Sequence, residues 1–148
     1  MLDVREMLRT LTDEQLRLLR ESGYSEKTIQ LYADKVNIGV IRKPDVVETY
    51  IGPCGDVIEL YLRIGRNNVI QDAKFNYLGC PGSAAAASAL TELVKDKTVN
   101  KAKKLTATDI LKQLEGLPKP KLDCPKLVIA ALQKAIAKYE KRKGHSHA

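Results

Sequence analysis

The chain carries its clearest structural signal in the stretch Asp56-Val57-Ile58-Glu59-Leu60-Tyr61-Leu62-Arg63-Ile64. Apolar side chains alternate along it with more polar or aromatic ones, and this period of two predicts a half-buried β-strand. Similar β-branched and aromatic residues fill Val46–Tyr50 and Val69–Tyr77, so we expect three strands. Gly65-Arg66-Asn67-Asn68 lies between the last two, and because Gly and Asn tolerate positive φ, it predicts a hairpin with antiparallel pairing.

Helices are predicted before these strands. Thr12-Asp13-Glu14-Gln15 fits a capping box at a helix start, and Ser25 is expected to cap a helix that ends near Asp34. Residues 1–24 form a predicted N-terminal helical extension, which could pack on the domain, bind a partner or mediate self-association. Its apolar stripe at helical spacing comprises Leu2, Val4, Met7, Leu8 and Leu11.

Further helices are predicted after the strands. Ser83 is expected to cap one that runs to about Lys95, and shorter ones follow at Val99–Lys103 and Thr108–Leu114. The segment 116–120 holds two prolines and predicts a stiff extended linker, after which Pro125 takes the first position of a last helix. The pattern therefore predicts an α+β fold, with a three-stranded antiparallel sheet and helices packed on one face.

Length and composition indicate one globular domain. The chain has 148 residues, 44% of them hydrophobic and 29% charged. We place the domain at residues 25–140, with a flexible tail at 141–148. No apolar segment resembles a signal peptide or approaches the length of a membrane span, so we expect a soluble protein of the cytoplasm.

Charge is distributed unevenly along the chain. The formal net charge is +7, and residues 95–148 hold fourteen Lys and Arg against five Asp and Glu. A nucleic-acid-binding module could use such a basic half. However, the chain has no Trp and one Phe, and its basic residues are not interleaved with aromatic ones. A solvated face or an acidic protein partner fits this pattern better.

The three cysteines are the candidate reactive groups. Three thiols cannot all pair within one chain, and no export signal indicates an oxidising compartment. Cys54 lies in a Gly/Pro loop before a strand, and Cys80 and Cys124 each come just before a predicted helix. A helix N-terminus stabilises a thiolate and can lower a cysteine pKa from about 8.5 to roughly 3.5–7.5. Free cysteines are also often buried, so a core-filling role is the alternative.

Asp56 adds a carboxylate two residues after Cys54. Three thiolates and one oxygen are an acceptable ligand set for Zn²⁺, and the same set can hold a [2Fe–2S] cluster. Because a hard carboxylate exchanges more readily on such a cluster than a thiolate does, this set favours a labile cluster. Asp56 could instead cap the turn after Cys54.

Four motifs in fixed order surround these residues. They resemble the NifU/IscU family of iron–sulfur cluster assembly scaffolds over about Ser25–Tyr139. The motifs are Gly52-Pro53-Cys54-Gly55-Asp56, Asp72-Ala73-Lys74-Phe75-x-x-x-Gly79-Cys80, Thr91-Glu92-x-Val94-Lys95 and Lys121-Leu122-x-Cys124.

The resemblance implies a non-catalytic scaffold on which a transient [2Fe–2S] cluster is built from iron and sulfur and then passed on. It implies Cys54, Asp56, Cys80 and Cys124 as the metal and cluster ligands, with zinc a candidate in the cluster-free form. It also implies that Cys124 accepts sulfur from a cysteine desulfurase. Expected partners are that desulfurase, recipient apo-iron–sulfur proteins and, as a further candidate, a ferredoxin; no membrane or nucleic acid is expected.

Two departures from the family pattern leave questions open. Asp123 stands where IscU-type proteins have a histidine, and it could be a spare ligand, a helix N-cap or a solvated side chain. Leu117-Pro118-Lys119-Pro120-Lys121 replaces the family's Leu-Pro-Pro-Val-Lys, so recognition by a dedicated chaperone stays open. The alternative function is a zinc-dependent sulfurtransferase of SufU type, but those relatives carry an insertion between the second and third cysteines.

Overall fold

The sheet has the predicted three strands. The computed structural model describes residues 11–53 and 55–146, and in it β1 (Val46–Ile51), β2 (Val57–Ile64) and β3 (Ile70–Leu78) form an antiparallel sheet in the order β1-β2-β3. The β2–β3 connection is a 3₁₀ turn over Arg66–Asn68, with φ of 61° at Asn67 and 58° at Asn68. The hairpin prediction, which rested on the tolerance of Asn for positive φ, is therefore confirmed.

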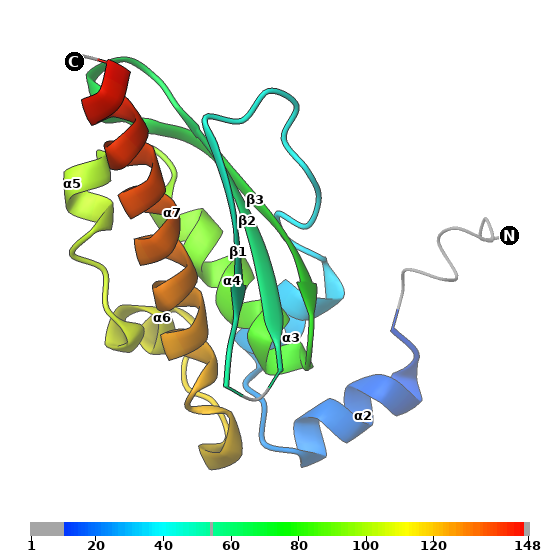
Figure 1. Cartoon of the computed structure of the whole chain (residues 1–148). Coiled ribbons are helices and arrows are strands. Elements are labelled where there is room, and N and C mark those ends of the chain that lie inside the picture. The colour runs from blue at the N-terminus through cyan, green and yellow to red at the C-terminus, as the bar shows by residue number, and fades with distance from the viewer. Residues whose placement is uncertain (1–10, 54, 147–148) are drawn as a thin grey trace, which may run out of the picture.

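Helices precede and follow the sheet, as Figure 1 shows. Their bounds are α2 (Asp13–Glu21), α3 (Glu26–Ala33), α4 (Pro81–Val94), α5 (Val99–Ala102), α6 (Ala107–Gln113) and α7 (Cys124–Ser146), with a 3₁₀ turn at Lys119–Lys121. The predicted capping box is present, because Thr12 accepts from the Gln15 N–H while Gln15 accepts from the Thr12 N–H. Ser25 caps α3 as predicted. Most of the apolar stripe, residues 2–8, lies outside the described residues.

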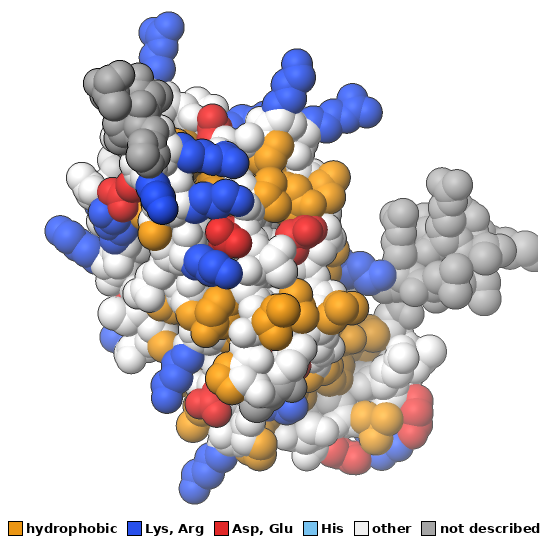
Figure 2. All heavy atoms as spheres, in the orientation of Figure 1, with side chains coloured by type: hydrophobic (Ala, Val, Ile, Leu, Met, Phe, Trp, Pro, Cys, Tyr) orange, Lys and Arg blue, Asp and Glu red, His pale blue; other side chains and the backbone are white. Residues whose placement is uncertain are grey.

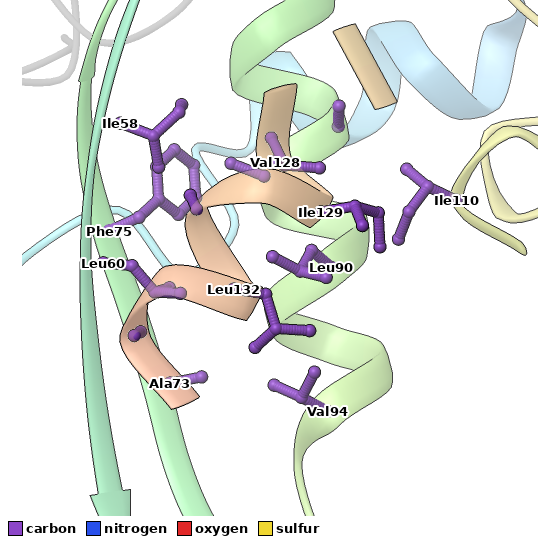
Figure 3. Close-up of a cluster of buried hydrophobic side chains, with 14 of the residues drawn as sticks. Ile58, Leu60, Ala73, Phe75, Leu90, Val94, Ile110, Val128, Ile129 and Leu132 are labelled. Carbon is purple, nitrogen blue, oxygen red and sulfur yellow. The ribbon is translucent and has the colours of Figure 1, made fainter. Parts of the chain in front are cut away.

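The core lies between the sheet and the two helices α4 and α7, which cover one of its faces (Figure 3). Ile58, Leu60 and Leu62 are at most 1% exposed, so the alternation along β2 is confirmed. They meet Leu90 from α4 and Leu132 from α7, which are equally buried. The alanine run of α4 is buried too, and its small side chains let the helix lie close to the sheet.

The start of α4 differs from the sequence prediction. Cys80 is the N-cap residue and Pro81 takes the first helical position, where its missing N–H costs nothing. Ser83 therefore does not cap the helix but lies within its first turn, fully buried. Because Ser83 does not cap the helix, its hydroxyl is available for the contacts described below.

The last helix is longer than predicted. Residues 141–146, which the sequence placed in a flexible tail, continue α7. Arg142 reaches the Asp45 carbonyl from this segment with an Nη1–O distance of 3.3 Å. Lys and Arg side chains gather around this C-terminal part of α7, and hydrophobic ones lie lower on the same face (Figure 2). Within the described part of the chain, no helix combines the length and apolarity that crossing a membrane requires.

Candidate metal centre

Three segments that are distant in sequence meet at one end of the sheet. They are the β1–β2 loop, the start of α4 and the start of α7, and a pocket of about 160 Å³ lies between them. The Gly52 N–H donates to the Asp56 carbonyl at 2.8 Å and closes the base of the loop. The pocket is lined by Gly52, Pro53, Asp56, Cys80, Ser83, Pro120, Lys121, Asp123, Cys124 and Leu127.

Two of the predicted ligands stand side by side in this pocket. Cys80 is the N-cap of α4, Cys124 is the first residue of α7, and their sulfur atoms are 3.9 Å apart. That distance is far longer than the roughly 2.05 Å of a disulfide. Two sulfur atoms bound to the same tetrahedral metal ion at about 2.3 Å would be about 3.8 Å apart. The spacing of the two thiols therefore suits a shared metal ion.

Asp56 reaches the same place from the loop. Its Oδ2 atom lies 4.0 Å from the Cys80 sulfur. Gly79 makes this approach possible, since a Cβ atom on Gly79 would lie only 2.8 Å from the Asp56 carboxyl carbon. Gly82 similarly leaves room for both thiols, because a Cβ there would be 3.1 Å from the Cys124 sulfur and 3.6 Å from that of Cys80.

Ser83 connects the carboxylate to the two thiols. Its hydroxyl donates to Asp56 Oδ2 at 2.5 Å and lies 3.5 Å from the Cys80 sulfur and 3.7 Å from the Cys124 sulfur. Sequence reasoning did not include Ser83 in the site. Pro81 at the first helical position was the available signal, because it would have placed Cys80 and Ser83 three residues apart on one helix face.

The two thiols share one proton across their contact. The hydrogen bond from the Cys124 thiol is the main cause that lowers the pKa of Cys80 to about 4, and the Ser83 hydroxyl and N–H and the charge of Lys121 act in the same direction. Donating that bond, together with burial, holds the pKa of Cys124 well above its usual range. Cys80 is therefore the thiolate of the pair at neutral pH.

Lys121 and Tyr24 complete the surroundings of this thiolate, and neither was singled out as a site residue from the sequence. The negative charge of Cys80 is the main cause that raises the pKa of Lys121. Burial is the main cause that raises the pKa of Tyr24, and the Cys80 charge adds to it. The half-buried negative charge of Cys80 thus has a cation and a phenol near it.

Cys54, the remaining predicted ligand, lies outside the described residues. Pro53 and Asp56, on either side of it, both line the pocket. Within 11–53 and 55–146, no three side chains of His, Cys, Asp or Glu are grouped so that they could hold a metal ion. Asp123, which was left outside the predicted ligand set, lines the pocket and lies 3.7 Å from the Lys126 ammonium.

Comparison with known proteins shows the family of this chain. Residues 23–146 match the model of the family described as "NifU-like N terminal domain". The chain is 37% identical over 122 residues to "Iron-sulfur cluster assembly scaffold protein IscU 1" of Archaeoglobus fulgidus, covering 82% of this chain and 79% of that protein. It is 39% identical over 121 residues to "Iron-sulfur cluster assembly enzyme IscU" of Drosophila melanogaster, covering 79% and 78%.

A solved structure agrees with the fold. The N-terminal part of a nitrogen-fixing NifU-like protein from Brucella abortus superposes with a TM-score of 0.67 at 19% identity, covering 83% of this chain and 98% of that one. The fold and the pocket define an α+β domain that presents thiols at two helix N-termini. The chain belongs to the NifU-like N-terminal domain family.

Proposed function

We propose that this chain is a scaffold on which a labile [2Fe–2S] cluster is assembled and from which it is passed to recipient apoproteins. The observation that carries the proposal is the meeting of Asp56, Cys80 and Cys124 in one pocket, beside the loop that holds Cys54. The names of the relatives support it, since they are called cluster assembly proteins. The cluster is the cargo of this site and not a resident cofactor, so we do not class the chain as an enzyme.

The ligands we propose are Cys54, Asp56, Cys80 and Cys124. Two thiolates on helix N-termini suit iron or zinc, because the helix ends stabilise their negative charge. Asp56 is the hard, exchangeable donor of the set, and Ser83 holds one of its oxygens. An incoming cysteine of a recipient can displace a carboxylate more easily than a thiolate. This difference supports delivery over electron transfer.

Sulfur enters, in this proposal, as a persulfide from a cysteine desulfurase. The sulfur of Cys124 attacks the outer persulfide sulfur, a new S–S bond forms at Cys124, and the donor's cysteine leaves as a thiolate. Cys124 is 8% exposed, its sulfur lies 3.9 Å from that of Cys80, and its raised pKa keeps it protonated. Cys124 must therefore turn outward and lose its proton before it attacks. Reduction of that sulfur to sulfide needs an electron donor, and a ferredoxin is the candidate. We expect the protein to carry out this assembly in the cytoplasm.

Anaerobic reconstitution tests the proposal. The purified chain, supplied with ferrous iron, sulfide and a reductant, should develop the absorption spectrum of a [2Fe–2S] cluster. Cys54→Ser, Cys80→Ser and Cys124→Ser should each lower cluster content and lifetime, while Ser88→Ala, a buried change elsewhere on α4, should leave both unchanged.

Two outcomes would contradict the scaffold role. Full cluster content in all three Cys→Ser variants would show that the site is wrong. A zinc-loaded protein that relays sulfur over many turnovers and takes up no cluster would instead support the sulfurtransferase alternative.

A further inference from the structure

The two edges of the sheet are covered in different ways. The β3 edge pairs with backbone: the Gly39 N–H donates to the Phe75 carbonyl at 2.9 Å, and the Ile70 N–H donates to the Lys97 carbonyl at 2.8 Å. Among the residues that the structure describes, the backbone of β1 pairs with a strand on one side, β2, and with none on the other. Strands with an uncovered row of N–H and C=O groups are templates for pairing with another chain.

The outward groups of β1 belong to its odd-numbered residues. The bond from the Gly52 N–H to the Asp56 carbonyl sets the register, in which the even-numbered residues face β2. The carbonyls of Val47 and Thr49 therefore point away from the sheet. Asp45 precedes the strand and does not follow this alternation, since its N–H donates to the Leu62 carbonyl of β2 at 2.9 Å. The carbonyls of all three residues accept a hydrogen bond from a basic side chain of α7.

These basic side chains form a ladder along the edge. Lys134 donates to Thr49 O at 3.2 Å, Lys138 to Val47 O at 2.9 Å, and Arg142 to Asp45 O at 3.3 Å. Four residues of an α-helix rise about 6 Å, and two residues of a strand about 6.6–6.8 Å, so each helical step meets the next outward carbonyl. This match requires α7 to lie along β1 in the opposite direction, as it does (Figure 1).

Glu48 completes the cover. Its Oε1 atom accepts the outward N–H of Thr49 at 3.1 Å, and its carboxylate lies 3.7 Å from the Lys134 ammonium and 4.0 Å from that of Lys138. The Glu48 side chain is 18% exposed, so these contacts are partly shielded from solvent. Side chains thus occupy outward donors and acceptors that a further strand would need.

The sequence of β1 explains why such a cover matters. Val46-Val47-Glu48-Thr49-Tyr50-Ile51 has high β-propensity, one charge and neither Pro nor Gly, which is the composition of segments that stack into intermolecular sheets. If β1 paired antiparallel with β1 of a second copy in a symmetric register, Val47 of each chain would lie opposite Thr49 of the other. Both residues present outward backbone groups, so the edge is complementary to itself.

We propose that the ladder of Lys134, Lys138 and Arg142 closes the β1 edge against pairing with a second copy of this chain. The ladder replaces the hydrogen bonds that a neighbouring strand would make and sets fixed positive charges along the edge. Two chains brought edge to edge would have to break these bonds and bring two rows of like charge together.

The test compares two double variants of equal charge and composition. Lys134→Met with Lys138→Met removes two rungs but keeps the length of the side chains. Lys104→Met with Lys112→Met makes the same change at exposed lysines away from β1. Sedimentation velocity over a concentration series should show the ladder variant self-associating at a concentration at least about tenfold lower than the control variant, a difference of about 1.4 kcal/mol.

A third change distinguishes pairing of the β1 strands from nonspecific hydrophobic association. Thr49→Pro removes an outward N–H and blocks pairing at this edge, so adding it to the ladder variant should restore the behaviour of the control. If the double variant does not fold, Lys138→Met alone removes one rung and should show a smaller shift in the same direction. Equal association of the ladder and control variants, or association that persists with Thr49→Pro, would overturn the proposal.

Discussion

The two walls of the pocket around Cys80 and Cys124 are built differently. One wall consists of helix starts: Cys80 and Ser83 on α4 and Cys124 on α7, with Ser83 fully buried and Cys124 8% exposed. The other is the β1–β2 loop, in which Pro53 and Gly55 are exposed and only Gly52 is buried among its described residues. The helix wall is continuous with the hydrophobic core, whereas most described residues of the loop wall are exposed to solvent or partly exposed.

This difference separates two tasks of the site. Helices packed on a sheet hold their first residues in one place, so the thiols of Cys80 and Cys124 are positioned before any metal arrives. A loop with an exposed glycine can move at small energetic cost, which suits Asp56 as the ligand that we propose exchanges. We therefore expect changes in the helix wall to affect metal affinity most, and changes in the loop wall to affect delivery or stability.

The largest effect is expected for Ser83→Ala. The change removes the hydrogen bond that orients Asp56 and one that lowers the pKa of Cys80. Loss of such an orienting partner typically weakens metal binding by about 10–100-fold. Zinc affinity, measured by competition with a chromophoric chelator, checks this.

Ser88→Ala is the matched control for that change. Ser88 is also buried on α4, and its hydroxyl donates to the Val36 carbonyl at 2.8 Å, away from the pocket. Both variants should lose roughly 0.5–3 kcal/mol of unfolding free energy in urea, because each removes a part-buried hydrogen bond that a buried serine donates. Equal zinc affinities for the two variants would show that Ser83 supports the fold and not the site.

Asp56→Ala should act on delivery. Without the exchangeable carboxylate, the cluster should last longer, and its transfer to an apo-ferredoxin should slow by about fivefold, or about 1 kcal/mol in the barrier. Absorption and circular dichroism of the recipient follow the transfer. Asp123→Ala is the control, since Asp123 also lines the pocket but pairs with Lys126. Unchanged or faster transfer from Asp56→Ala would contradict the exchange role.

A smaller effect is expected for Gly55→Ala in the loop. Gly55 has φ of 87°, and apart from Gly55 itself and its two chain neighbours no described atom lies within 4 Å of the point that an added Cβ would occupy. The change therefore costs backbone strain, about 1–2 kcal/mol. Gly116→Ala is the control, because Gly116 has φ of 97° and equally open space but lies outside the pocket lining. Both should lose similar stability in urea, and only Gly55→Ala should also weaken zinc binding. A loss of affinity in both would show that the loop wall has no separate role.

The smallest effect is the response of Cys80 to pH. Since its pKa is lowered to about 4, Cys80 in the metal-free protein is a thiolate throughout the range from about pH 5.5 to 8, and its alkylation rate should be flat there. Cys124, whose pKa is raised, stays protonated and should react slowly. Peptide mass spectrometry after timed iodoacetamide pulses resolves the two sites. A Cys80 alkylation rate that rises tenfold per pH unit in this range would contradict the lowered pKa. In Ser83→Ala, the pH at which the Cys80 alkylation rate begins to fall should be higher.

Local patterns were sufficient for most elements. Alternation along β2, the capping box at Thr12 and the two asparagines of the hairpin each act within a few residues, and the structure confirms all three. The prediction for the start of α4 was wrong because two local signals competed. Ser83 is a good N-cap by composition, but Pro81 fits the first helical position, and the helix begins there.

By itself the sequence determined the three antiparallel strands, the placement of Cys80 and Cys124 at helix starts, and the family motifs around them. Only the tertiary structure decided that these two thiols, 44 residues apart, meet at 3.9 Å, because that distance depends on how α4 and α7 pack on one sheet face. It also decided the roles of Ser83 and of the lysines of α7. The direction of a hydroxyl or an ammonium depends on what lies opposite it in space, and no pattern of neighbours along the chain contains that information.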